Sequence, residues 1–278
     1  MNWNPSQLEA FELNRLSWDE RVDTHWKSAM YQKHIADLRA GRPCLRERIV
    51  AAVGDVAGLS LAHLQCHMGM ETLSWSLLGA DAVGLDFSQP AIARAEQLRD
   101  ELKLDTRFVC CNVYDAVEAL KQAYDIIFIS VGAICWLPDI DRCARVVRAL
   151  LKPGGRLYMN EVHPFLEAFD DDADGRNIAV CYPYLDAPGL QFDRQGSYAD
   201  TSATFRHTRT VDYLHSLGSI VTAVARAGMV IDRLAESAEC VWPRFKMMEQ
   251  TGPDDWAMPG PALGRLPHTY TLTAHVPV

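Results

Sequence analysis

The acidic residue Asp86 ends an apolar stretch, DAVGLDF at 81–87, and its position suits a ligand that carries a sugar ring. An earlier apolar stretch at 59–65 leads into a turn and a helical segment, so the region predicts a strand, a helix and a second strand. In such a βαβ unit, an acid at the end of the second strand accepts hydrogen bonds from the two hydroxyls of a ribose. Asp86 is therefore the first candidate binding residue.

The turn QCHMG at 65–69, which precedes the helix of this unit, contains a single glycine, Gly69. A dinucleotide-binding turn needs three glycines so that its backbone can approach a pyrophosphate. This turn therefore argues against a nicotinamide-dependent dehydrogenase. An adenosine ligand without phosphates does not impose the same requirement, and S-adenosylmethionine is such a ligand. The pattern favours transfer of a methyl group.

Three residues are candidates for a general base. Histidine suits this role near neutral pH because its pKa is about 6.5. His163 is the first choice, because it follows a predicted strand at the edge where open α/β sheets bind ligands. His215 is the second choice and Glu161 the third. Each histidine has an alternative role in satisfying backbone groups of a loop or a helix start, and a base is needed only when the acceptor atom arrives protonated.

Aromatic side chains are candidates for a substrate pocket, because aromatic faces attract sulfonium and ammonium groups. We expect Tyr31, Trp136 and Tyr198 to contact substrate. Most aromatic residues of any chain lie in the core, and we expect Phe11 and Trp18 there.

Strand and helix patterns alternate from residue 59 onward, which predicts a parallel sheet with helices on both faces. Ser88, followed by Gln-Pro, marks the start of one helix, and Pro153-Gly154-Gly155 is expected to end another. Helical segments are predicted within 6–50 and at about 36–53, the latter interrupted near Gly41 and Pro43. Strands are then predicted at 59–65, 81–87, 106–112, 124–130, 156–162, 229–236 and 269–276, and helices at about 70–79, 89–102, 140–151 and 216–228.

This succession resembles the class I S-adenosylmethionine-dependent methyltransferases over about residues 55–275. The resemblance implies an α/β, Rossmann-like methyltransferase fold with a central, mostly parallel seven-stranded sheet, helices on both faces and an antiparallel last strand. It also implies S-adenosyl-L-methionine as cofactor and S-adenosyl-L-homocysteine as product. HLQCH, LDFS, CWLPD and HPF together resemble a narrower subgroup that acts on small molecules. The matching stretches are HLQCHMG at 63–69, GLDFS at 84–88, Asn112-Val113, YDIIFISVGAICWLPD at 124–139 and LLKPGGRLYMNE at 150–161.

The resemblance also assigns residues to the cofactor. In the family an acid usually ends the first strand and a Gly-x-Gly-x-Gly turn follows. Here His63 stands at the position of the acid, and Gln65 and His67 replace two of the glycines. The usual water-mediated contact with the amino group of the cofactor then passes to Gln65 or to backbone carbonyls. The residues expected against the cofactor are Gln65, His67, Gly69, Thr72, Asp86, Phe87, Asn112, Val113 and Ser130.

Two regions lie outside the alternating pattern. Residues 1–55 are predicted to form an N-terminal helical lid or extension, and 56–278 the methyltransferase domain. Within that domain, the segment at about 163–212 is rich in Asp, Pro, Gly and Tyr and is predicted to be a cap insertion over the active site.

Composition limits the classes of partner. The net charge of −9 argues against a nucleic-acid surface, which requires clustered Lys and Arg. The sequence has neither an apolar run of about 20 residues for a membrane span nor the pattern of a signal peptide, so we expect a cytoplasmic protein. The eight cysteines form no CxxC pair, so we expect reduced thiols and no metal. The oligomeric state stays open.

The leading hypothesis is transfer of a methyl group to an N, O or S atom of a small molecule. The replaced glycines motivate one alternative, a non-catalytic S-adenosylmethionine-binding protein of the same fold. An RNA methyltransferase is the other, and the negative charge argues against it.

Overall fold

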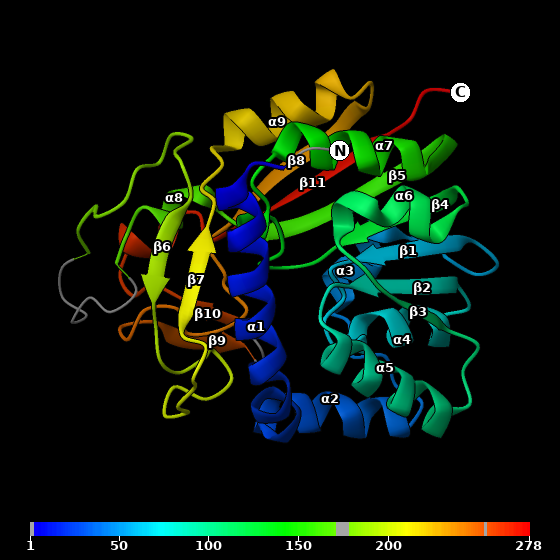
Figure 1. Ribbon diagram of the computed structural model, residues 1–278, viewed down its shortest axis with the longest axis horizontal. Coiled ribbons are helices and arrows are strands. Elements are labelled where there is room, and N and C mark those ends of the chain that lie inside the picture. Colours follow the sequence, from blue (N-terminus) through cyan, green and yellow to red (C-terminus); the bar gives the residue numbers. More distant parts are fainter. Residues whose placement is uncertain (1–2, 171–177, 253–254) are drawn as a thin grey trace.

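The computed structural model describes residues 3–170, 178–252 and 255–278. Its centre is a seven-stranded sheet in the order β3-β2-β1-β4-β5-β11-β8 (Figure 1). The first five strands of this order run parallel, and β11 is antiparallel to both of its neighbours. The predicted mostly parallel sheet with an antiparallel last strand is therefore confirmed. The strands are β1 (Ser60–Leu64), β2 (Asp81–Asp86), β3 (Arg107–Cys110), β4 (Tyr124–Ile129), β5 (Leu151–Val162), β8 (Val230–Ser237) and β11 (Thr269–His275).

The strand order changes direction between β1 and β4, because β2 lies on one side of β1 and β4 on the other. Open α/β sheets bind ligands at such a point, outside the carboxyl ends of the strands. The loops after β1, β2 and β4 contact one another there and contain several of the predicted site residues, among them Gln65, His67, Phe87 and Ser130.

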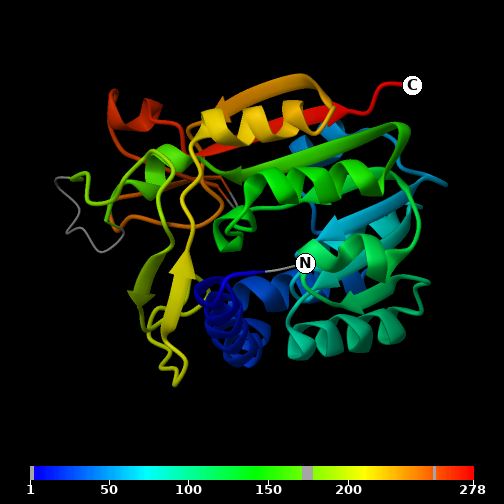
Figure 2. The same ribbon diagram turned by 45° about the horizontal axis from the view of Figure 1, so that its top comes forward.

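Helices cover both faces of this sheet (Figures 1 and 2). The hydroxyl of Ser88 accepts a hydrogen bond from the backbone of Ala91 and caps α5, as the sequence predicts. The helices are α1 (Pro5–Lys27), α2 (Ala29–Arg39), α3 (Glu47–Val53), α4 (Met70–Leu77), α5 (Gln89–Leu102), α6 (Ala116–Leu120), α7 (Ile140–Leu150), α8 (Pro164–Glu167) and α9 (Leu217–Arg226).

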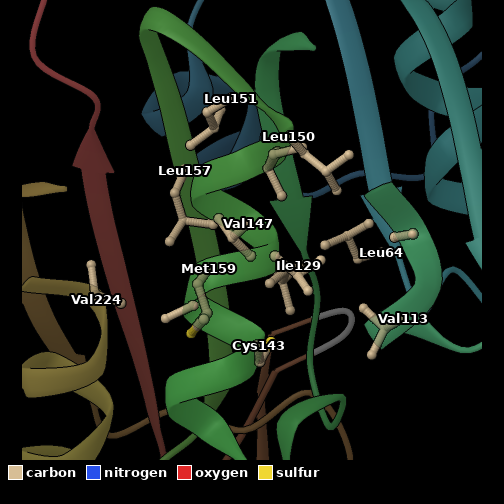
Figure 3. Packing of buried hydrophobic residues seen from close by; sticks show 14 of the residues in the cluster. Leu64, Val113, Ile129, Cys143, Val147, Leu150, Leu151, Leu157, Met159 and Val224 are labelled. Atoms are coloured by element: carbon tan, nitrogen blue, oxygen red, sulfur yellow. The ribbon is translucent and has the colours of Figure 1, made fainter. Parts of the chain in front are cut away.

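The largest hydrophobic cluster lies under α7. Cys143, Val147 and Leu150 recur at helical spacing, and all three are buried. In Figure 3 they face Ile129 on β4 and Met159 on β5. This packing fixes the two strands whose carboxyl ends contribute the loop after β4 and the histidine after β5.

Two boundaries differ from the prediction. The helical segment expected at about 36–53 is interrupted as predicted, where the chain turns through Gly41 in a left-handed conformation and then meets Pro43, but its first helix, α2, begins earlier, at Ala29. Pro153-Gly154-Gly155 does not end α7, which stops at Leu150. The three residues lie within β5, where the backbone of Gly154 donates a hydrogen bond to Val276.

A second layer stands beside the sheet. A two-stranded ribbon, β6 (Leu190–Asp193) and β7 (Arg209–Asp212), lies within the predicted cap, of which residues 171–177 fall outside the described part. A second ribbon pairs β9 (Glu249–Gly252) with β10 (Asp255–Ala257). α1 runs between β7 and the sheet (Figure 1). The side chain of Asn14 exchanges two hydrogen bonds with the backbone of Val211, at 2.9 and 2.8 Å.

No helix in the described ranges has the length and apolar character needed to cross a bilayer.

The close packing of β2 against β3 makes Gly84 a test of the sheet. A Cβ added there would lie 2.7 Å from the ring of Phe108 and 2.8 Å from the sulfur of Cys66. We expect Gly84→Ala to lower the free energy of unfolding by about 1–3 kcal/mol, measured by urea denaturation. The control is Gly218→Ala in α9, where the added Cβ meets only the Ser216 hydroxyl at 3.8 Å. A variant at position 84 as stable as this control would contradict the packing.

Candidate active site

The turn after β1 keeps the backbone of a glycine-rich turn without most of the glycines. Gln65, His67 and Gly69 all have positive φ values, of 58°, 48° and 73°. This left-handed region favours glycine and is costly for other residues. The turn therefore presents its backbone as three glycines would, and adds two side chains.

Asp86 lies at the end of β2, facing this turn. One carboxylate oxygen accepts a hydrogen bond from the backbone of His67 at 2.8 Å, and the other from the backbone of Ser88 at 2.9 Å. A carboxylate oxygen has two lone pairs, so each can accept one more donor. Burial raises the pKa of Asp86 to about 6. The arrangement suits the two hydroxyls of a ribose.

The residues expected beside an adenine follow β2 and β3. Phe87 is half-buried next to Asp86. The side-chain oxygen of Asn112 accepts a hydrogen bond from the backbone of Tyr114 and caps a short helical turn at 113–115. Val113 is buried in the main hydrophobic cluster. Their roles toward a cofactor stay predictions.

His63 occupies the position where an acid is expected, and it is neutral. Its Nδ1 lies 2.9 Å from the hydroxyl of Thr72, and its Nε2 lies 3.0 Å from the hydroxyl of Ser130. Burial lowers its pKa to about 3. Thr72 and Ser130, both predicted cofactor residues, thus hold a histidine that supplies no charge.

Glu71 is a residue that sequence reasoning missed. Its carboxylate lies 4.0 Å from Nε2 of His63 and forms a hydrogen bond with Ser130. Its position in the sequence does not single it out, because an acid in the first turn of a helix is common for electrostatic reasons alone.

Gln65 points away from the turn toward the loop after β4. Its side-chain nitrogen donates a hydrogen bond to the carbonyl of Ala133 at 2.9 Å. Gln65 therefore links the loop after β1 to the loop after β4. A contact with the cofactor stays a prediction.

α1 covers the turn with a group of rings. Nδ1 of His25 lies 3.1 Å from Nε2 of His67, and burial lowers the pKa of both histidines, to about 3 and about 4. The ring of Trp18 lies 5.3 Å from that of His67 and 5.5 Å from that of Trp136. Trp18, which we expected in the core, therefore lies at the site. Sequence reasoning also missed His25, which is seven residues from Trp18 and shares a helix face with it.

Two of the three predicted substrate residues meet in this group. The hydroxyls of Tyr31 and Tyr198 lie 2.6 Å apart, and the ring of Tyr31 stacks on His25 at 5.6 Å. Trp136 reaches the group through Trp18. The three residues come from α2, the loop after β4 and the predicted cap, so the fold brings distant segments together.

Glu161, the third candidate base, fixes the loop after β4. Its carboxylate oxygens accept hydrogen bonds from the backbones of Gly132, Ala133 and Ile134, at 2.6, 2.8 and 3.1 Å. Burial raises its pKa to about 7. These contacts position the loop, and a role in proton transfer is not tested by them.

The two candidate histidines differ in their hydrogen bonds. Nδ1 of His163 accepts from the backbone of Phe165 at 3.1 Å, and Nε2 lies 2.8 Å from the carboxylate of Glu236. Nε2 of His215 lies 2.7 Å from the carbonyl of Leu137. His215 lines a small cavity beneath the cap, together with Gly132, Ile134, Cys135, Glu161, Val162, Pro164, Glu167, Tyr213 and Leu214.

A family model described as a methyltransferase domain matches residues 62–157, which run from β1 into β5. Residues 62–157 thus match a methyltransferase domain, as the resemblance to the class I S-adenosylmethionine-dependent methyltransferases predicts. The resemblance seen in the sequence is therefore confirmed, and the cofactor of the family is S-adenosylmethionine.

Relatives and solved structures agree with this family. A ubiquinone biosynthesis O-methyltransferase of Nitrobacter winogradskyi is 30% identical over 127 residues, which cover 44% of this chain and 46% of that protein. The chain thus spans about half the length of that curated relative. A structure of an S-adenosylmethionine-dependent methyltransferase from Mesorhizobium loti has a TM-score of 0.55 at 20% identity, covering 82% of this chain and 95% of that one. A putative S-adenosylmethionine-dependent methyltransferase from Listeria monocytogenes has a TM-score of 0.59 at 15% identity, covering 83% and 97%. These two structures show the shared fold.

The residues present fit this cofactor. A buried carboxylate with spare lone pairs suits the ribose, and the turn exposes its backbone at three left-handed positions. Glu71 provides a carboxylate at the other side of the turn. Among the residues that the structure describes, no group of three His, Cys, Asp or Glu is placed to hold a metal ion.

The neutral state of His63 can be tested by acidification. An imidazole in the unfolded chain gains a proton as the pH falls below about 6.5, whereas buried His63 stays neutral down to a pKa of about 3. The unfolded state then binds more protons than the folded state, so the free energy of unfolding decreases as the pH is lowered. Between pH 6.5 and 5, we expect the wild-type protein to lose about 2 kcal/mol more than His63→Gln, measured by urea unfolding at each pH. Equal pH slopes would contradict a neutral, buried His63.

Proposed function

We propose that this protein transfers a methyl group from S-adenosylmethionine to an N, O or S atom of a small molecule. The observation that carries the proposal is the carboxylate of Asp86 against a left-handed turn at 65–69, beneath α1. This arrangement offers the contacts that an adenosyl group needs without those of a pyrophosphate.

Two observations support a small acceptor. α1 and the β6–β7 ribbon stand over the carboxyl edge of the sheet (Figure 1), which favours an enclosed pocket. The net charge of −9 disfavours a nucleic-acid substrate. The relatives named ubiquinone biosynthesis O-methyltransferase support an oxygen atom as acceptor.

When bound, the sulfonium group of the cofactor supplies an activated methyl group. The protein then has to align the acceptor atom with that methyl group and to exclude water. Asp86 and the turn at 65–69 hold one side of the site, and Trp18 and Trp136 close it from α1 and the loop after β4.

His215 is the base that the geometry favours, if the acceptor is a hydroxyl. Its Nε2 donates to the carbonyl of Leu137, so Nδ1 is the unprotonated nitrogen and can accept a proton. Burial lowers the pKa of His215 and keeps it neutral. Both nitrogens of His163 are already engaged, by Phe165 and Glu236. His215 also lines the cavity, so it replaces His163 as the first choice.

Calorimetric titration tests the cofactor site. We expect S-adenosylmethionine and S-adenosylhomocysteine to bind the wild-type protein, and Asp86→Ala to weaken binding by about 1–3 kcal/mol through lost ribose hydrogen bonds. The control is Asp81→Ala at the exposed start of the same strand, which should bind as the wild type does. Unchanged affinity in Asp86→Ala would remove the main support for the proposal.

Kinetics of two matched variants test the base. For a hydroxyl acceptor, we expect His215→Gln to lower kcat by about 10²–10⁴-fold, because the glutamine amide can still donate to Leu137 but cannot accept the proton. The affinity for S-adenosylhomocysteine should not change. His163→Gln is the comparison and should reduce kcat less. A larger loss at position 163 would return the role to His163.

A further inference from the structure

The amino-acid end of S-adenosylmethionine must be held on the opposite side of β1 from the ribose. Asp86 ends β2, and the strand order is β2-β1-β4, so a ligand with its ribose at Asp86 extends across β1 toward the loop after β4. This end of the ligand carries an α-ammonium group. An ammonium that leaves water needs a carboxylate or carbonyl partner.

Position 63 cannot provide the charge. Both nitrogens of His63 are engaged, by Thr72 and Ser130, and the ring is neutral. A neutral imidazole whose two nitrogens are already hydrogen-bonded offers a cation neither a negative charge nor a free lone pair. The negative charge at this end of the site must come from another residue.

Glu71 is placed to supply it. The residue lies in the first turn of α4, eight positions after His63, with 30% of its side chain exposed. Its carboxylate lies 4.0 Å from Nε2 of His63. The hydroxyl of Ser130 contacts both residues, at 3.0 Å from His63 and within hydrogen-bond distance of Glu71. The three side chains thus form a chain between the ends of β1 and β4.

We propose that Glu71 binds the α-ammonium of the cofactor, and that His63 and Ser130 position its carboxylate. The negative charge that usually lies at the end of the first strand in this family would then lie in the first turn of α4 in this protein. The inference rests on the proposed function, because it takes S-adenosylmethionine as the ligand.

The partly buried setting of Glu71 supports this role. Burial raises the pKa of its carboxyl even though the Ser130 hydrogen bond and the charge of Arg46 oppose the shift, so its charged form gains from a further cation placed beside it. A contribution to the dipole of α4 is a separate effect, and would not depend on which ligand is bound.

Two ligands that differ at one end separate these effects. S-adenosylhomocysteine carries the amino-acid end, and 5′-methylthioadenosine has the same adenosine and thioether but lacks it. We expect Glu71→Gln to raise the Kd of S-adenosylhomocysteine at least tenfold and to leave the Kd of 5′-methylthioadenosine unchanged, both measured by calorimetry. Glu118→Gln, an exposed first-turn acid of α6, is the matched control and should change neither Kd.

A second comparison changes the ligand and begins with the wild-type protein. An S-adenosylhomocysteine analogue that lacks only the α-amino group should bind the wild-type protein at least tenfold more weakly than S-adenosylhomocysteine. In Glu71→Gln the two ligands should bind nearly alike, which completes a double-mutant cycle between the carboxylate and the amino group. Thermal unfolding of the ligand-free variants reports whether the fold is intact.

The outcomes are distinguishable. If Glu71→Gln changes the affinity for both adenosine ligands equally, or if the deaminated analogue binds the wild-type protein as tightly as its parent, the inference is overturned and the cofactor site stands. If neither S-adenosylhomocysteine nor 5′-methylthioadenosine binds the wild-type protein, the proposed function itself fails.

Discussion

The site depends on one strained segment, the left-handed turn at 65–69. A left-handed conformation costs a non-glycine residue about 1–2 kcal/mol, and Gln65 and His67 both adopt it. The contacts of these residues offset that cost. The ring of His67 contacts His25 at 3.1 Å, and the side chain of Gln65 donates to the carbonyl of Ala133. Three glycines would give the same backbone without these side chains, so the substitutions link the turn to its surroundings.

Most of the fold could be predicted because its signals are local. Periodic apolar runs identify the strands of the seven-stranded sheet, and Ser88 followed by Gln-Pro identifies the start of α5. The ribbons β6–β7 and β9–β10 could not be predicted, since each strand is only three or four residues long and is defined by its partner. Gly41 and Pro43 correctly predict the break between α2 and α3, but residues 153–155 show the same limit, because a proline or glycine does not specify which element follows.

A site residue can be proposed from the sequence alone where its residue type has one usual meaning at its position. Asp86 at the end of a strand is such a residue. Glu71 is not, because an acid in the first turn of a helix has an electrostatic reason of its own. The choice between His163 and His215 depends on partners distant in sequence. Glu236 lies 73 residues from His163, and Leu137 lies 78 residues from His215. Those contacts decide which ring nitrogen has a lone pair, and only the folded chain contains them.

Residues that contact Asp86, the carboxylate proposed to bind a ribose, also contact α1. The backbone of Ser88 donates to Asp86, while its hydroxyl donates to Asp19 of α1 at 2.6 Å. The backbone of His67 also donates to Asp86, and its ring contacts His25 of α1 at 3.1 Å. Two independent links therefore run from one carboxylate to one helix. A ligand that draws Asp86 into new hydrogen bonds would change the electrostatic environment of both links, so we expect binding at Asp86 to be coupled to the position of α1.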